Sequence, residues 1–121
     1  DILSLHCPLT DANQHLINQR TLGLMKPTAF VVNTARGKLV NSGDLISALE
    51  QGVIAGAAID VLDTEPPEKD ELLTAAAARL DNLLVTPHNA WGARESRMRL
   101  VQQTRENILG HISGNNLRVV N

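Results

Sequence analysis

The stretch Ala29-Phe30-Val31-Val32-Asn33-Thr34-Ala35-Arg36-Gly37 decides the fold. Its first four residues are apolar and partly β-branched, which is typical of a strand buried on both faces of a parallel sheet, and we expect Phe30 in the core. The strand stops at Asn33-Thr34. Ligands of open parallel sheets bind beyond the carboxyl ends of the strands, so Arg36 is placed to hold an anion rather than to pack.

Composition limits the classes of function. The chain has 121 residues, 43% of them hydrophobic and 20% charged, which predicts one ordinary globular domain. A net charge of −2 without a basic stripe argues against nucleic-acid binding. No apolar run approaches the roughly 20 residues of a membrane span, and no signal-peptide pattern is visible. The single cysteine, Cys7, excludes an internal disulfide and favours a cytoplasmic location.

Strand-like and helix-like segments alternate four times, which predicts βαβ units around a parallel sheet. We expect strands at 1–6, 29–33, 53–60 and 82–86. We expect helices, caps included, at 18–25, 41–52, 68–79 and 91–111. Because the chain opens inside a strand and not on methionine, we interpret it as part of a longer protein.

Polar residues follow each expected strand: His6-Cys7, Asn33 to Arg36, Asp60 with Glu65, and Pro87-His88. In a parallel sheet these positions lie along one edge. An arginine grips a carboxylate with two hydrogen bonds, and a histidine suits proton transfer near neutral pH. A glutamate beside that histidine stabilises its protonated form. The combination indicates reduction of a carbonyl group next to a carboxylate.

Each of these residues alone has a structural interpretation, such as a solvated arginine, a turn or a loop acid. Their coincidence at one edge favours the catalytic interpretation. We expect no metal site, because adjacent strand residues such as His6 and Cys7 point to opposite faces and spaced ligand pairs are missing. Trp91, three residues after His88, is a candidate for a wall of the substrate pocket.

These residues resemble a known family, the D-isomer-specific 2-hydroxyacid dehydrogenases. The Ala90-Trp91 pair after His88 is most similar to the glycerate dehydrogenase (hydroxypyruvate reductase) branch. The matching stretches, in the order and spacing of the family, are His6 to Thr10, Leu24 to Pro27, Val32 to Gly37, Gly56 to Val61 with Glu65-Pro66, and Thr86 to Ala90.

The resemblance implies an α/β fold, a partial Rossmann-like domain with a parallel sheet of about four strands, flanking helices and a long C-terminal helix. Residues 1–121 would form the second half of a dinucleotide-binding domain with its crossover helix. The substrate domain and the half with the glycine-rich loop G-x-G-x-x-G are absent from this sequence. The ribose-selecting acid is absent with them, so NAD and NADP both remain open as the cofactor.

The resemblance also implies roles for single residues. Arg36 would bind the substrate carboxylate, His88 would exchange a proton with the C2 oxygen, and Glu65 would pair with His88 and keep its pKa high. Asp60 would hold the nicotinamide carboxamide. Besides Arg36, Asp60 and His88, the cofactor would contact His6, Cys7, Pro8, Thr34 and Ala35.

The implied activity is the NAD(P)-dependent interconversion of a small D-2-hydroxy acid and its 2-keto acid, of the glycerate/hydroxypyruvate or glyoxylate type. We expect the 121 residues alone to be inactive, because the phosphate loop is missing. A cofactor-sensing or corepressor-like binding protein on the same fold stays an alternative, since such proteins can keep these residues. The exposed edge strand 2–6 and the long helix predict association into a homodimer.

Overall fold

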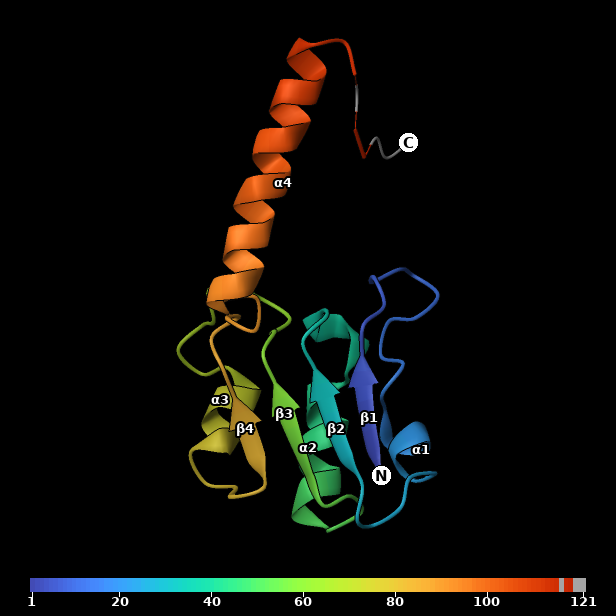
Figure 1. Cartoon of the computed structure of the whole chain (residues 1–121). Coiled ribbons are helices and arrows are strands. Elements are labelled where there is room, and N and C mark those ends of the chain that lie inside the picture. The colour runs from blue at the N-terminus through green and yellow to red at the C-terminus, as the bar shows by residue number, and fades with distance from the viewer. Residues whose placement is uncertain (116, 119–121) are drawn as a thin grey trace. The chain divides into compact units, whose positions relative to one another are not determined.

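The computed structural model describes residues 1–115, 117 and 118 and consists of two units, Asp1–Asn89 and Ala90–Asn121. The first unit is built on a four-stranded parallel sheet (Figure 1). Its strands, neighbours in chain order, are β1 (Ile2–Leu5), β2 (Phe30–Asn33), β3 (Gly56–Ile59) and β4 (Leu83–Val85). The predicted α/β class with a parallel sheet is confirmed.

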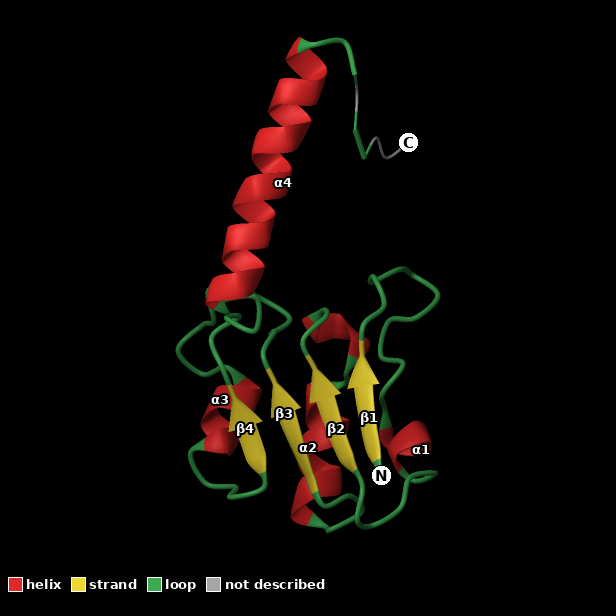
Figure 2. Ribbon diagram, in the orientation of Figure 1, coloured by secondary structure: helices red, strands yellow, loops and turns green. Residues whose placement is uncertain are grey.

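The helices of the first unit are short, and α2 and α3 lie on the same face of the sheet (Figure 2). Their bounds are α1 (Gln19–Leu22), α2 (Ser42–Glu50) and α3 (Leu72–Ala77), with a 3₁₀ turn η1 (Gly37–Leu39) that the sequence did not predict. With its N-cap Glu71, the helix α3 begins three residues later than expected. The Glu71 carboxylate accepts hydrogen bonds from the backbone N–H groups of Leu73 and Thr74.

Asparagine side chains start the other two helices, as predicted. Asn18 forms a capping box at α1, and Asn41 accepts a hydrogen bond from the Asp44 amide at the start of α2. The Asp44 carboxylate also accepts from the Gln19 amide at 2.9 Å, which ties the first turns of α1 and α2 together. Gly52, with φ of 66°, ends α2 in the left-handed conformation that glycine favours.

The core lies between the sheet and the helices. Burying one such aliphatic side chain contributes about 1.5–3 kcal/mol, so this layer holds the sheet and the helices in place. The most deeply buried large aliphatic side chains are Leu22, Val31, Leu39, Val40, Leu45, Ile54, Ile59 and Val61.

The expectation that β2 is buried on both faces is wrong, because the face of the strand that carries Phe30 is exposed. Val31 and Asn33 point into the core, whereas Phe30 is 47% exposed. In the first unit the helix layer covers only the face to which Val31 belongs, so alternate residues of β2 remain open. The Phe30 ring lies over Gly56 on β3, where a Cβ atom would approach the ring to 2.8 Å.

The second unit is dominated by α4 (Arg94–Ile112), the predicted long C-terminal helix. Its large apolar side chains are exposed, including Met98, Val101, Ile108 and Ile112. After the helix, the Asn115 amide donates to the Gly110 carbonyl, and Leu117 packs over Gly110. Val119 and Val120, which the sequence suggests could pack or pair, lie outside the described residues. No helix in the described part of the chain has the length and apolarity to cross a membrane.

Candidate functional site

The carboxyl ends of the four strands are aligned in one row. Leu5 is paired with Asn33, Asn33 with Ile59, and Ile59 with Val85. Since neighbouring strands lie roughly 4.8 Å apart, the loops after β2 and β4 leave the sheet roughly 10 Å from each other. The candidate residues that follow these strands therefore share one edge, within reach of a common small ligand.

His88 and Glu65 form an ion pair at this edge. His88 Nδ1 lies 2.5 Å from Glu65 Oε2, and both side chains are partly exposed. Glu65 Oε1 also accepts a hydrogen bond from the Leu62 amide at 2.9 Å. These two hydrogen bonds, the Leu62 bond first, hold the pKa of the Glu65 carboxyl below its ordinary value. The carboxylate thus stays ionised beside the imidazole.

Asp60, directly after β3, is a buried carboxylate, only 4% exposed. Its Oδ1 atom accepts hydrogen bonds from the Thr86 hydroxyl and, at 3.0 Å, from the Asn89 amide. Thr86 and Asn89 flank His88 in the chain. The His88 backbone has φ of 50°, in the left-handed region that non-glycine residues seldom occupy.

The loop that carries Arg36 is held by Asn33, whose side chain is 0% exposed. Asn33 Oδ1 accepts from the Ala35 amide at 3.0 Å, and Asn33 Nδ2 donates to the Arg36 carbonyl at 2.8 Å. The Arg36 side chain is exposed, and its Nη1 donates to the Ala35 carbonyl at 2.6 Å. The guanidinium is therefore presented to solvent by a loop whose backbone is fixed from within.

Gly37 brings this loop against the loop after β3. A Cβ atom at Gly37 would overlap the backbone carbonyl of Leu62 and the amide of Asp63. Only glycine permits this approach. The two loops that carry Arg36 and Glu65 consequently touch through their backbones.

The remaining predicted residues lie in three places. His6, Cys7 and Pro8 follow β1, where His6 Nε2 lies 2.8 Å from Ser4 Oγ and the Pro8 carbonyl accepts from Asn13. Thr34 and Ala35 lie in the loop after β2, beside Arg36. Trp91 belongs to the second unit and is 58% exposed, and its role in a substrate pocket stays a prediction. Among residues 1–115, 117 and 118, no group of three or more His, Cys, Asp or Glu side chains is arranged to hold a metal ion.

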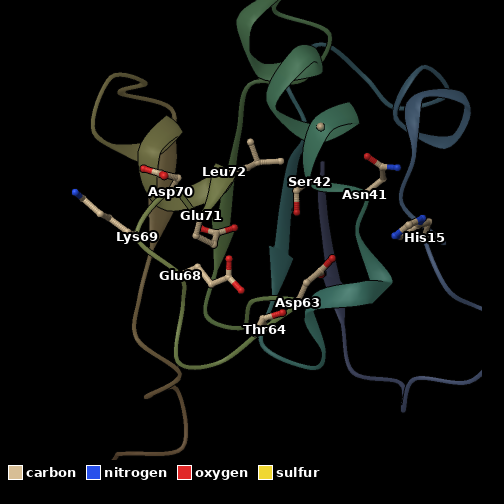
Figure 3. A pocket seen from close by; sticks show the side chains of 11 residues that line it. His15, Asn41, Ser42, Asp63, Thr64, Glu68, Lys69, Asp70, Glu71 and Leu72 are labelled. Carbon is tan, nitrogen blue, oxygen red and sulfur yellow. The ribbon is translucent and has the colours of Figure 1, made fainter.

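A mostly apolar cavity of about 510 Å³ adjoins the His88–Glu65 pair. Its wall continues over α3 and the end of β4, and it is completed by Leu62, Pro66, Pro67, Thr74, Ala77, Val85, Thr86 and Pro87. A second hollow, shown in Figure 3, is polar and holds none of the predicted site residues. Two of its polar side chains, Asn41 and Glu71, cap α2 and α3. The edge at His88 is therefore the candidate site.

Sequence reasoning assigned no role to three residues of this edge: Asn33, Thr86 and Asn89. Asn33 carried a usable signal, because an asparagine at the end of a strand often bonds to the backbone two residues later. Thr86 was assigned to a strand only, and nothing in the sequence indicates that its hydroxyl meets a carboxylate 26 residues earlier.

Residues 1–90, which include β1 to β4 and all the strand-end loops, match the model of a family described as D-isomer specific 2-hydroxyacid dehydrogenase, NAD binding domain. The chain belongs to this family. The predicted family relationship is confirmed, and the residues that the family model covers include Arg36, Asp60, Glu65 and His88.

Individual family members agree with this assignment. The chain is 45% identical over 114 residues to a glyoxylate reductase of Aeropyrum pernix, and 40% identical over 120 residues to a glycerate dehydrogenase of Methylorubrum extorquens. These alignments cover 94% and 99% of the chain but only 33% and 38% of the relatives, so the chain spans about a third of their length.

Solved structures show the same fold. A D-isomer specific 2-hydroxyacid dehydrogenase from Lactobacillus delbrueckii ssp. bulgaricus, in its NAD complexed form, superposes with a TM-score of 0.86 at 35% identity. The match covers 100% of this chain and 40% of that chain. The partial Rossmann-like architecture predicted from the sequence is confirmed.

Proposed function

We propose that this chain carries the substrate-binding and proton-transferring half of a site that interconverts a small D-2-hydroxy acid and its 2-keto acid. The observation that carries the proposal is the His88–Glu65 pair on the same row of strand ends as the exposed Arg36. The match to the family supports it. NAD or NADP would be the redox partner.

The residues present fit one end of such a cofactor. The buried Asp60 carboxylate and the backbone at Thr34-Ala35 offer the polar groups that a nicotinamide carboxamide needs, and His6 to Pro8 lie at the same edge. The glycine-rich loop that binds the pyrophosphate has no counterpart in the 121 residues. We therefore propose that the chain is the second half of a dinucleotide-binding domain with its crossover helix.

The chain's own residues would divide the chemistry. A bound reduced nicotinamide supplies a hydride to C2 of the keto acid. The Arg36 guanidinium would hold the carboxylate by two hydrogen bonds and draw electron density from the neighbouring carbonyl. The His88 imidazolium would donate its proton to the C2 oxygen, which becomes the hydroxyl. Ionised Glu65 would favour the protonated imidazole before transfer.

The proposed substrates are glyoxylate and hydroxypyruvate, because the relatives are named for glyoxylate and glycerate. Both are small, and a carboxylate adjoins the carbonyl in each. The mostly apolar walls of the cavity beside His88 offer contact surface to a small ligand.

A chimaera tests the proposal. The matched segment of the Methylorubrum glycerate dehydrogenase would be replaced by this chain, and NADH oxidation would be followed with hydroxypyruvate and with glyoxylate. The chimaera should turn over one of them, and R36A should lower kcat/KM by about 10²–10³ because a charge-stabilising donor is lost. The 121 residues alone should give negligible turnover.

The control is R36K in the same chimaera. Lysine keeps the positive charge but cannot form the planar bidentate contact, so this variant should retain part of the affinity for the substrate carboxylate. A folded chimaera that binds NADH yet reduces neither keto acid would overturn the proposed activity and favour a cofactor-sensing role.

We also propose that copies of the chain associate into a homodimer in a reducing compartment such as the cytoplasm. The edge strand β1 exposes Ile2, and α4 exposes an apolar row from Met98 to Ile112. Such surfaces favour pairing with another chain. A monomeric mass by light scattering at micromolar concentration would contradict the dimer.

A further inference from the structure

The Asp60 carboxylate holds the chain on both sides of His88. Its Oδ1 atom accepts from the hydroxyl of Thr86, two residues before the histidine, and from the amide of Asn89, one residue after it. The His88 amide itself donates to the Thr86 carbonyl at 3.0 Å. These three hydrogen bonds hold the backbone on both sides of His88.

These hydrogen bonds are needed because His88 is in an unfavourable backbone conformation. Its φ of 50° costs free energy for a side chain with a Cβ atom, and such conformations persist only where the surroundings impose them. This conformation accompanies the 2.5 Å approach of His88 Nδ1 to Glu65. If the segment relaxed, the imidazole would turn away from the carboxylate.

Thr86 is the side chain on which the arrangement depends. A buried carboxylate is stable only with hydrogen-bond donors, and the Thr86 hydroxyl is one of the two donors described at Asp60 Oδ1. The Thr86 amide also donates to the Ile59 carbonyl at 2.9 Å, so the residue is anchored to β3 by backbone and side chain. Neither the hydroxyl nor Asn89 has a role in the proposed proton transfer itself.

We propose that Thr86 is a positioning residue that acts through Asp60 to fix the His88 backbone and aim the imidazole at Glu65. Asp60 then has a second task beside its proposed contact with the cofactor. The catalytic meaning of this arrangement rests on the proposed function. The geometric claim concerns the chain alone.

The test is a titration of His88 in the chain Asp1–Asn121 without cofactor or substrate. Histidine labelled with ¹³C reports each imidazole by NMR, and the His88 signal is assigned by its loss in H88Q. Asp60 is a further charged group that acts on Glu65, and E65Q gives the reference for a broken pair. T86V removes the hydroxyl and keeps the shape of the side chain, whereas T86S keeps the hydroxyl.

T86V should move the His88 titration midpoint in the same direction as E65Q, because the imidazole no longer meets the carboxylate. T86S should keep the wild-type midpoint. T86A provides a second removal of the hydroxyl in case the valine disturbs packing.

A folded T86V or T86A chain with an unchanged His88 midpoint would overturn the proposal. Loss of dispersed amide signals in both variants would overturn it too, since Thr86 would then serve only the fold. If the titration behaves as expected while the chimaera reduces no keto acid, the positioning role stands and the proposed function fails.

Discussion

Two loops at the same edge of the sheet are built in opposite ways. The loop after β2, Asn33 to Gly37, is held by Asn33, whose two hydrogen bonds reach only two and three residues along the chain. The loop after β4, Thr86 to Asn89, is held by Asp60, which lies 26 and 29 residues earlier. Each loop presents one candidate catalytic side chain.

The difference shows that one site can combine a loop held by hydrogen bonds within itself and a loop held by a side chain from another strand. The side-chain hydrogen bonds of the buried Asn33 stay within its own loop, although the backbone of that loop also contacts Leu62 at Gly37. A buried carboxylate that bridges two strands makes the His88 geometry depend on the pairing of β3 with β4. Arg36 is thus locally supported, whereas His88 is supported across the sheet.

Gly37→Ala should have the largest effect on stability, because its Cβ would overlap the Leu62 backbone. The loops carrying Arg36 and Glu65 would be forced apart, and overpacking of this kind costs about 3 kcal/mol. Urea unfolding measures the loss. Gly43→Ala in α2 is the matched control, since its Cβ would meet only the Asn41 side chain at an ordinary 3.5 Å. That control should be neutral or slightly stabilising.

Asn33→Ala should lower the free energy of unfolding by about 2 kcal/mol, since the part-buried Ala35 amide and Arg36 carbonyl lose their partner. Asn41→Ala, which removes only the cap of α2, should cost about 1 kcal/mol. Equal losses in the two variants would show that Asn33 does no more than an ordinary cap. Amide hydrogen exchange at Ala35 would locate the change.

Glu65→Gln should have the smallest effect on stability, below about 1 kcal/mol, because the ion pair is partly exposed. The pKa of Glu65 is lowered in the fold, so its contribution is present above its ordinary value of 4.5 and is lost as the pH falls through the lowered value. The stability difference between wild type and E65Q should therefore shrink below about pH 4.5. Urea midpoints from pH 6 to pH 3 measure it, with Glu68→Gln as control.

In the chimaera, the same Glu65→Gln change should move the alkaline limit of keto-acid reduction to lower pH, because the carboxylate favours the protonated imidazole. An unaltered pH profile of kcat/KM would remove Glu65 from the proposed mechanism.

The contrast between the two loops also explains what the sequence could predict. Strand and helix order followed from apolar runs and from the caps Asn18 and Asn41, and both caps are confirmed. The edge with Arg36, Glu65 and His88 followed from the rule that parallel strands end together. Long-range contacts lay beyond such reasoning, as the bond between Thr86 and Asp60 shows.

The exposed Phe30 was wrongly placed in the core for a related reason. A run of apolar residues reports that a strand suits burial, but not whether anything covers its second face. The late start of α3 is a local miss, because glutamate is not among the preferred N-cap residues and Glu71 therefore carried no signal for the helix start.

Because Leu5, Asn33, Ile59 and Val85 are paired in one row, the position of each residue after a strand depends on the number of residues in that strand. Deleting a single residue within β3 would turn Asp60 to the opposite face of the sheet and remove the support of His88. Insertions at the other end of the strands, in the turns before Phe30 or Gly56, would leave the row untouched. Designed changes of substrate should therefore exchange residues beyond the strand ends and preserve every strand's residue count.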